Sequence, residues 1–234
     1  MAKRMYGVIK MLLRSFSEAS ILTDDLVEQL KRILCNAVAQ RGHAYLVVSG
    51  GKTPIDLFKT LAKTDIPWEK ITITLTDERC VSAHDPDRNE RLVRQFLLQH
   101  HAAKAHFLSL YNEDYSLEQT EQMIASLPTF DAVVLGMGED GHIASLFPCS
   151  QELSMGLDDN AAAVLRISPK TAPHQRISLS KKRLLNSRVI FLHLLGQKKL
   201  TVLHQAMAEH DSMVMPVSAF LNNFDANVQV LYAP

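Results

Sequence analysis

One histidine follows a glycine-rich turn at the end of an apolar segment. Residues 132–135 read Ala-Val-Val-Leu, a run typical of a strand covered on both faces of a parallel sheet. Gly136, Gly138 and Gly141 come next and allow the backbone to turn sharply and to approach a ligand closely. His142 follows them. Because ligands of open α/β sheets bind beyond the carboxyl ends of the strands, this imidazole is a candidate general base.

Three other interpretations compete for this loop. The glycines match the dinucleotide fingerprint G-x-G-x-x-G, but Pro148 would end or kink the long helix that this fingerprint requires. Taken alone, His142 could also be a satisfied cap or core residue. Ser145 does not stand in the G-x-S-x-G pattern of a nucleophile, which favours an ordinary turn or helix residue. The neighbouring motifs favour a catalytic histidine.

A second turn with two glycines lies at residues 49–54, between a predicted strand and a predicted helix. Gly50 and Gly51 expose backbone N–H groups there, while Thr53 suits the helix N-cap and Pro54 suits the first helical turn. Free N–H groups and the positive end of a helix dipole favour a phosphate or a carboxylate. The Walker A pattern does not fit, because its first glycine would fall on a leucine. The turn, which contains Lys52, is a candidate anion site. A plain tight β-α turn without a ligand would have the same sequence pattern.

A cluster of charged residues follows the next predicted strand. Asp77, Glu78 and Arg79 come almost directly after an apolar run, where charges are costly to bury unpaired. Arg79 offers a fork for an anionic or hydroxylated substrate, and Asp77 offers a carboxylate that could orient it or the histidine. A solvated corner between strand and loop is the competing interpretation.

Basic residues follow strand or turn signals in the second half of the chain, namely Lys170, Arg176 and Lys199. Each of them, taken singly, is typical of a surface charge. However, loops that follow successive parallel strands meet at one edge of the sheet. The glycine-rich, charged and histidine-bearing loops are therefore expected to form one site.

The elements that position these loops alternate between strands and helices. A helix capped by Thr23 or Asp24 and stopped by Gly42 precedes a strand at 44–48. Further helices are predicted at about 54–62, 89–99, 180–186 and 198–208, and further strands at 71–75, 106–110, 132–135, 161–167, 176–179, 189–194 and 228–232. The polar segment 149–160 is expected to be a surface loop. This alternation predicts an α/β fold of Rossmann-like type, with a mostly parallel open sheet and helices on both faces, in a single domain over residues 1–234.

The composition restricts the function classes. The 25 basic and 25 acidic residues cancel, so no electrostatic footprint for nucleic acid or for an anionic membrane is expected. Cys35, Cys80 and Cys149 are widely spaced, which favours free and mostly buried thiols over a disulfide framework or a zinc site. Lys10 and Arg14 interrupt the apolar stretch near the N-terminus, so neither a signal peptide nor a membrane span is predicted. The protein is expected to be cytoplasmic.

Several segments together resemble the 6-phosphogluconolactonases, and the resemblance runs along nearly the whole chain. They are the Ser-Gly-Gly-x-Thr-Pro turn at 49–54, the Asp-Glu-Arg cluster at 77–79 with Asn89 downstream, the highly specific Gly-Met-Gly-x-Asp-Gly-His-x-Ala-Ser-Leu-Phe-Pro segment at 136–148, and weaker patterns at 169–179 and 196–199. Two positions depart from the family pattern. Cys149 stands where these lactonases usually have glycine, and no proline follows the Asp-Glu-Arg cluster.

The resemblance implies the deaminase/lactonase type of fold and the hydrolysis of 6-phospho-D-glucono-1,5-lactone to 6-phosphogluconate, in the oxidative pentose phosphate pathway. His142 would act as the base on an attacking water, with no metal, cofactor or covalent nucleophile. Asp77 or Asp140 would orient the imidazole. Arg79 or N–H groups of the loop would stabilise the developing negative charge.

The same resemblance implies how the substrate's phosphate is bound. The phosphate would lie against the glycine turn at 50–53, where Lys52 and Thr53 stand beside the two glycines. Arg176 and Lys199 would close on it, and Lys170 belongs to the same set of candidate binding residues.

Two other functions fit the same fold family. Glucosamine-6-phosphate deaminases share the glycine loop and the Asp-Gly-His turn, but they continue with Phe-Asn-Glu-Pro, which supplies a carboxylate close to the histidine. Here residues 145–148 read Ser-Leu-Phe-Pro, so that group is missing. Non-catalytic sugar-phosphate sensors carry a separate DNA-binding segment, whereas residues 1–43 have room for about one helix and show no helix-turn-helix pattern.

Overall fold

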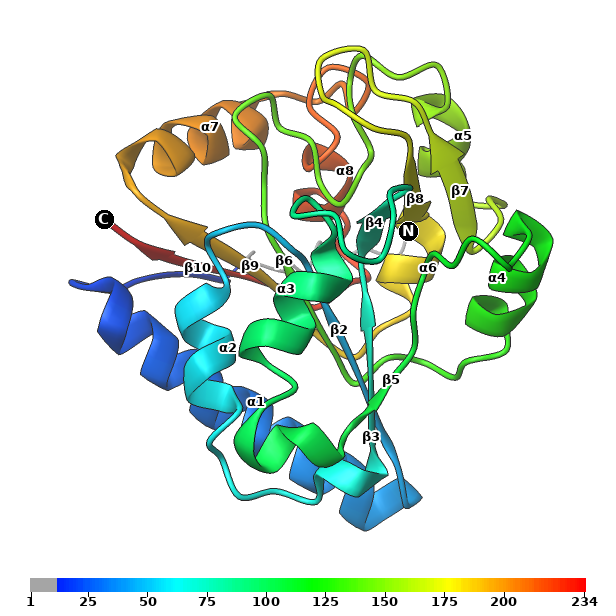
Figure 1. The fold of residues 1–234 in the computed structure, drawn as a ribbon. Coiled ribbons are helices and arrows are strands. Elements are labelled where there is room, and N and C mark those ends of the chain that lie inside the picture. The colour runs from blue at the N-terminus through cyan, green and yellow to red at the C-terminus, as the bar shows by residue number, and fades with distance from the viewer. Residues whose placement is uncertain (1–11) are drawn as a thin grey trace, which may run out of the picture.

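The computed structural model describes residues 12–234, and its main feature is a parallel sheet of seven strands (Figure 1). The strand order is β1-β10-β9-β6-β2-β3-β5. The strands are β1 (Leu12–Ser15), β2 (Ala44–Val48), β3 (Ile71–Leu75), β5 (His106–Phe107), β6 (Ala132–Leu135), β9 (Ile190–Leu195) and β10 (Val228–Ala233). All the pairings are parallel, which confirms the predicted sheet.

A smaller antiparallel sheet holds three strands in the order β4-β8-β7. They are β4 (Asp77–Arg79), β7 (Val164–Ile167) and β8 (Arg176–Leu179). The strands predicted at 161–167 and 176–179 thus exist, but they do not join the parallel sheet. The connection from β7 to β8 spans residues 168–175, which is too short for a parallel crossover and suffices for an antiparallel hairpin.

Helices cover both faces of the large sheet, as predicted. They are α1 (Ala19–Arg41), α2 (Ile55–Leu61), α3 (Asn89–Phe96), α4 (Leu117–Ala125), α5 (Leu153–Leu157), α6 (Lys181–Leu185), α7 (Gln197–Ala208) and α8 (Ser218–Leu221), with short 3-10 helices at Trp68–Lys70 and His100–Lys104. The chain passes through β1, β2, β3 and β5 in one direction along the sheet and then returns through β6, β9 and β10. Right-handed crossovers therefore place α1, α2 and α3 on one face and the later helices on the other, in agreement with the contacts among them.

The longest helix, α1, packs an apolar stripe against the sheet. Leu22, Leu26, Leu30 and Leu34 are fully buried, and each is worth about 1.5–3 kcal/mol of burial free energy. Gly42 ends the helix with a φ of 79°, as predicted. The predicted start is wrong: the helix begins at Ala19, because the apolar stripe already starts one turn before the expected cap and Thr23 is itself buried.

Other elements depart from the sequence-based predictions. Segment 149–160 contains helix α5, in which Leu153 and Gly156 are buried and Gly156 packs against Leu146 of the glycine loop and Leu165 of β7, so it is not a plain surface loop. Strands β1 and β4 and helices α4 and α8 were not predicted, and the strand expected at 106–110 stops at Phe107. The three cysteines are free, as predicted, but half-buried.

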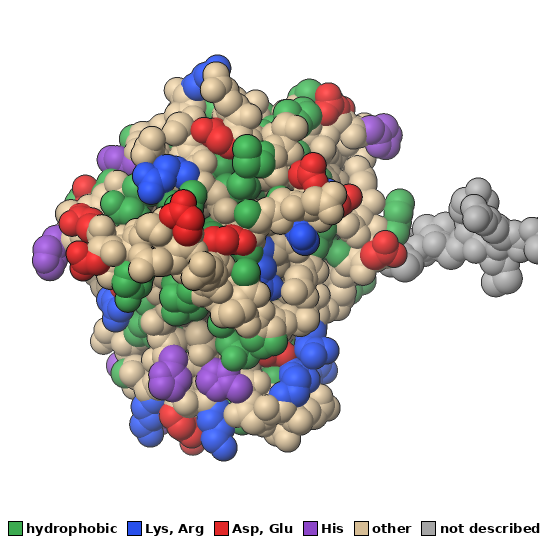
Figure 2. All heavy atoms as spheres, turned by 90° about the vertical axis from the view of Figure 1, so that its right-hand side faces the viewer, with side chains coloured by type: hydrophobic (Ala, Val, Ile, Leu, Met, Phe, Trp, Pro, Cys, Tyr) green, Lys and Arg blue, Asp and Glu red, His purple; other side chains and the backbone are tan. Residues whose placement is uncertain are grey.

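Residues 12–234 contain no helix that is both long and apolar enough to cross a membrane. The part of the N-terminal prediction that rests on Lys10 lies outside the described residues. On the face shown in Figure 2, acidic and basic side chains are interspersed with hydrophobic ones.

Candidate active site

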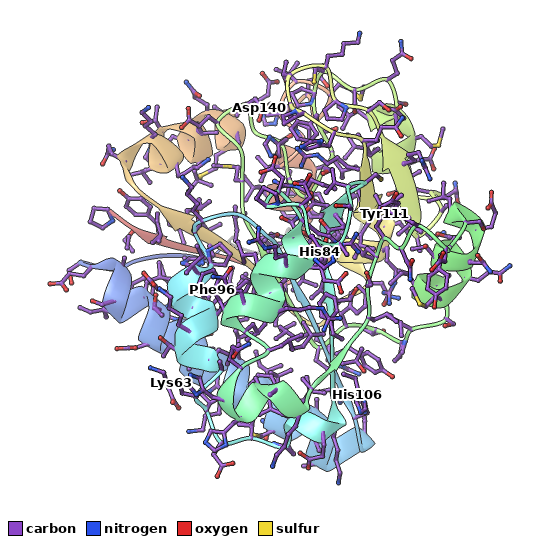
Figure 3. The ribbon with its side chains drawn as sticks, viewed as in Figure 1. Lys63, His84, Phe96, His106, Tyr111 and Asp140 are labelled. Atoms are coloured by element: carbon purple, nitrogen blue, oxygen red, sulfur yellow. The ribbon has the colours of Figure 1, made fainter. Side chains whose placement is uncertain are left out.

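A pocket of about 260 Å³ lies at the carboxyl ends of β2, β6 and β9, beside the small sheet. The residues that line it come from six separate segments of the chain: Ser49, Gly50, Gly51, Thr53, Pro54, Asp77, Arg79, Asn89, Val134, Leu135, Gly136, Met137, Gly138, His142, Ala144, Arg176, His193, Leu194, Leu195 and Lys199. This is the edge at which the predicted loops were expected to meet. Figure 3 shows Asp140 at this end of the molecule and His106 at the opposite end.

His142 and Asp140 form a hydrogen-bonded pair within the glycine loop. The imidazole Nδ1 lies 2.6 Å from Oδ1 of Asp140, and the backbone N–H of His142 donates to the same oxygen at 3.2 Å. Gly141 between them adopts a φ of 75°, which a residue with a side chain rarely adopts. Gly138 also has to be glycine, since a Cβ there would lie 2.1 Å from Nδ1 of His142.

The electrostatics of this pair favour an ionised carboxylate. Partial burial would raise the pKa of Asp140, but the hydrogen bond and the charge of His142 outweigh it and hold this pKa below its usual range. A carboxylate only accepts hydrogen bonds, so Nδ1 carries the proton when the imidazole is neutral. The lone pair is then on Nε2, and His142 lines the pocket.

Phe147 supports the pair from the side. Its ring is buried, and its centroid lies 4.1 Å from that of the His142 ring. The guanidinium carbon of Arg176 lies 5.6 Å from the centroid of the Phe147 ring. Phe147 therefore fixes the position of His142 relative to Arg176 through packing.

Asp77 does not orient the histidine. Its Oδ2 accepts a hydrogen bond from Ser145 Oγ at 2.5 Å, and its Oδ1 accepts one from Thr76 at 3.1 Å. Arg176 Nη1 lies 3.8 Å from Oδ2 of Asp77, with both side chains almost fully buried. Of the two carboxylates considered from the sequence, Asp140 contacts the imidazole, and Asp77 joins β4 to the glycine loop and to β8. Ser145 is fully buried, as expected for a structural residue.

Two arginines stand opposite each other across the small sheet. Arg79 on β4 pairs in register with Arg176 on β8, and like charges in such positions repel. Burial and the proximity of Arg79 lower the pKa of Arg176, although Asp77 acts in the opposite direction. Arg79 donates to the backbone oxygen of Asp87, and its buried Nε has no partner among the described residues. Both arginines line the pocket, so this wall of it favours an anion.

Glu78 and Asn89 anchor this wall. The fully buried Glu78 carboxylate accepts hydrogen bonds from the backbone N–H groups of Arg79, Asn89 and Glu90 at 2.6–2.8 Å. Burial raises the pKa of Glu78 to about 7, against the opposing effect of those three donors. The Asn89 side chain donates to the backbone oxygen of Asp77 and packs so closely on Gly50 that a Cβ there would lie 1.9 Å from Asn89 Oδ1.

Lys199 and the glycine turn complete the pocket. Lys199 lies near the start of α7, and its Nζ donates to the backbone oxygen of Met137 at 2.7 Å, which holds the ammonium beside the glycine loop. The N–H groups of Gly50 and Gly51 donate to no acceptor within residues 12–234. These donors and the ammonium are available to a negatively charged group.

The structure brings together most of the residues selected from the sequence. His142, Arg79, Asp77, Arg176, Lys199, Gly50, Gly51 and Thr53 all line the pocket, and Asp140 lies directly behind His142. Lys52 and Lys170 do not line it, and both are exposed. The prediction that Thr53 caps a helix is wrong, because it lies in a turn and α2 begins at Ile55 without a side-chain cap.

Some pocket residues were missed by sequence reasoning. Asn89 was noted only as part of a motif, and its contacts with Gly50 and Asp77 depend on the fold. His193 was not selected at all, although it is the one polar residue in the apolar run Ile-Phe-Leu-His-Leu-Leu of β9. A polar residue inside a buried strand is the signal that could have identified it. Within residues 12–234 there is no group of three His, Cys, Asp or Glu side chains placed to hold a metal ion.

The α/β fold brings a histidine–carboxylate pair and a wall with two arginines into one pocket at the sheet edge. A sequence model described as glucosamine-6-phosphate isomerases/6-phosphogluconolactonase matches residues 17–229. The chain belongs to this family, which confirms the resemblance predicted from its motifs.

Similar proteins are found both by sequence and by structure. A protein of Pseudomonas putida named 6-phosphogluconolactonase is 39% identical over 212 residues, which cover 88% of this chain and 85% of that relative. The crystal structure of a 6-phosphogluconolactonase from Shewanella baltica is 42% identical, covers 97% of this chain and 99% of its own, and superimposes with a TM-score of 0.93. A monomeric glucosamine-6-phosphate deaminase shares the fold at 19% identity, with a TM-score of 0.78.

Proposed function

We propose that this protein hydrolyses 6-phospho-D-glucono-1,5-lactone to 6-phosphogluconate. Family membership and the names of its relatives support this function. The observation that carries it is the placement of the His142–Asp140 pair in one pocket with Arg79, Arg176 and Lys199. Such a pocket offers a base for a water molecule and cations for a phosphorylated ester.

His142 is the proposed general base. Its Nε2 takes a proton from a water molecule while the water oxygen attacks the lactone carbonyl carbon. The tetrahedral intermediate then collapses by breaking the bond between that carbon and the ring oxygen. The imidazolium returns its proton to the departing oxygen, which gives the free acid and a hydroxyl and restores the neutral histidine. The carboxylate of Asp140 fixes the tautomer and stabilises the transient imidazolium.

Arg79 is the proposed partner of the developing oxyanion. In the glycine loop, the N–H of Gly138 already donates to the carbonyl of His142, and the N–H of Gly141 donates to Gly138. These groups are therefore engaged, whereas Arg79 has a buried Nε without a partner among residues 12–234. A well-placed donor of this kind typically contributes ~3–4 kcal/mol to transition-state stabilisation.

Arg176, Lys199 and the turn at 50–53 are the proposed phosphate site. The two cations reach the pocket from β8 and α7. Gly50 and Gly51, whose N–H groups donate to no acceptor within residues 12–234, line the same pocket. Binding energy from a phosphate remote from the carbonyl positions the reacting carbon against His142. We further propose that the reaction belongs to the oxidative pentose phosphate pathway, in which this lactone is the product of oxidising glucose 6-phosphate, and that the protein acts in the cytoplasm.

The experiment that tests this function follows the formation of 6-phosphogluconate from lactone generated from glucose 6-phosphate. We expect the purified protein to accelerate hydrolysis well above the spontaneous rate at the same pH. In parallel, glucosamine 6-phosphate should release no ammonia above a blank. Robust ammonia release without lactone hydrolysis would instead support a deaminase. A chelator is expected to leave the lactonase rate unchanged.

A further inference from the structure

His193 is a buried residue whose imidazole has no hydrogen-bond partner among residues 12–234. Its side chain lies in the central part of the sheet on β9, and the residue is 2% exposed. Both ring nitrogens, Nδ1 and Nε2, are buried and have no hydrogen-bond partner within residues 12–234. No other side chain in that range has two such atoms. Buried polar groups are normally paired, so this one calls for a partner that residues 12–234 do not supply.

The position of His193 places it at the pocket. It follows Leu192, which pairs with Leu135, the last residue of β6. This register puts His193 level with Gly136, where the glycine loop begins. A Cβ built on Gly136 would meet no atom within 4 Å, so there is open space at this point. His193 and Gly136 both line the pocket.

The chemistry of His193 matches a neutral hydroxyl group. Burial lowers the pKa of His193 to about 4, so its imidazole is uncharged near neutral pH. A neutral imidazole has an N–H donor at one ring nitrogen and an acceptor at the other, and a hydroxyl can pair with either one because it can both donate and accept. A phosphate is matched better by the cations of the pocket, Arg79, Arg176 and Lys199.

We propose that His193 is a specificity-determining residue that hydrogen-bonds a ring hydroxyl of the sugar lactone in the pocket. This inference rests on the proposed lactonase function, and it adds a contact to the polyol part of the substrate. A lactone that lacks this hydroxyl leaves the buried imidazole unpaired. The site therefore discriminates against deoxy lactones.

The test compares wild-type protein with His193→Leu on the complete lactone and on the lactones made from 2-deoxy-, 3-deoxy- and 4-deoxyglucose 6-phosphate. For wild-type protein, we expect kcat/KM to fall by roughly 10-fold to 100-fold on loss of one particular hydroxyl, the usual cost of an unpaired buried group. The His193→Leu variant should lose a similar factor on the complete lactone. It should then no longer distinguish that deoxy lactone, because the two changes remove the same contact.

Two further variants control this experiment. Ser218 has a buried Oγ with no hydrogen-bond partner among residues 12–234 but does not line the pocket, so Ser218→Ala should leave the discrimination intact. His193→Gln keeps a donor and an acceptor and should retain part of the discrimination, and it serves as the test should His193→Leu fail to fold. A leucine in this apolar strand is expected to preserve or raise the Tm, since it removes an unpaired polar group.

The possible outcomes separate the two proposals. A wild-type protein that does not accelerate lactone hydrolysis contradicts the proposed function. An active wild-type protein with equal discrimination in the wild-type, His193→Leu and His193→Gln forms would overturn the role of His193 and leave the lactonase function standing.

Discussion

Asp140 and His142 are two residues apart, and their contact depends on two glycines. Gly141 provides the left-handed turn that brings the side chains together, and Gly138 leaves the space that they occupy. The sequence motif predicted His142 as the base but left its orienting carboxylate open between Asp77 and Asp140. The choice could not be made from spacing, because Asp77 is also brought to the pocket and is excluded only by its bonds to Ser145 and Thr76.

A first prediction concerns this pair. Asp140→Asn should lower kcat at least roughly tenfold with little change in KM, because the amide no longer stabilises the imidazolium that forms during water attack. Steady-state kinetics with background subtraction measures the effect. Glu139→Gln is the matched control, since Glu139 is the exposed neighbouring carboxylate. Equal losses in both variants would show that the charge of the loop matters and that the contact with His142 does not.

A second prediction concerns phosphate recognition. Arg176→Ala and Lys199→Ala should each weaken binding of the phosphorylated lactone by about 10-fold to 150-fold, the range for losing a charge-assisted contact worth ~1.5–3 kcal/mol. Hydrolysis of unphosphorylated glucono-1,5-lactone should hardly change. Lys170→Ala is the control, because Lys170 is an exposed lysine outside the pocket. Equal losses on both substrates would place these residues at the reacting end.

At the scale of elements, the strands and helices with a regular apolar pattern were predicted correctly, and those without such a pattern were missed. Strands β2 and β6 are continuous apolar runs, and β3 alternates apolar residues with threonine. All three were predicted at their observed bounds. Strand β4 was missed because Asp77, Glu78 and Arg79 are untypical of a strand, and its formation depends on pairing with β8 and on the buried bonds of Glu78. Helix α5 was missed because its few apolar residues show no period and its burial is set by distant parts of the chain.

The glycine loop provides a third prediction. Gly138→Ala should abolish most lactonase activity, because its Cβ would overlap the His142 ring and lie 2.5 Å from Asp140 Oδ1. The ¹⁵N chemical shifts of the His142 ring should change, since the pair cannot keep its geometry. Gly136→Ala, where a Cβ meets nothing within 4 Å, should leave these shifts as in the wild type. Unchanged shifts in Gly138→Ala would mean that the loop does not hold the pair as described.

For the whole molecule, strand and helix alternation predicted the layers and the sheet edge that carries the site. The separation of β4, β7 and β8 into a second sheet could not be predicted, because it depends on pairing between residues far apart in the sequence. That sheet brings Arg79 opposite Arg176, so the wall of the pocket that carries the two arginines is a product of tertiary structure. The fold also buries His193 in the centre of the large sheet, with consequences for stability.

A fourth prediction is the dependence of stability on pH. The pKa of His193 falls from its ordinary value of 6.5 to about 4 on folding, so the unfolded chain binds the proton more tightly. The free energy of unfolding is therefore unaffected by protonation of His193 above pH 6.5. It decreases by up to about 3 kcal/mol as the pH falls toward 4, because the unfolded chain takes up the proton first. Urea unfolding at several pH values measures the free energy of unfolding of wild-type protein and of His193→Leu. The difference between the two proteins at each pH isolates the contribution of His193 from that of other titrating groups such as Glu78. A difference that stays constant between pH 7 and pH 4 would contradict the prediction.

The most direct test of the central claim is the background-subtracted turnover of lactone by His142→Ala. We expect kcat to fall by roughly 100-fold or more while the circular dichroism spectrum and Tm remain close to those of the wild type, as is usual for the loss of a general base. His204→Ala, which removes an exposed histidine from α7, should retain full activity under the same conditions. Near wild-type turnover by a folded His142→Ala variant would contradict the assignment of His142 as the base that activates water.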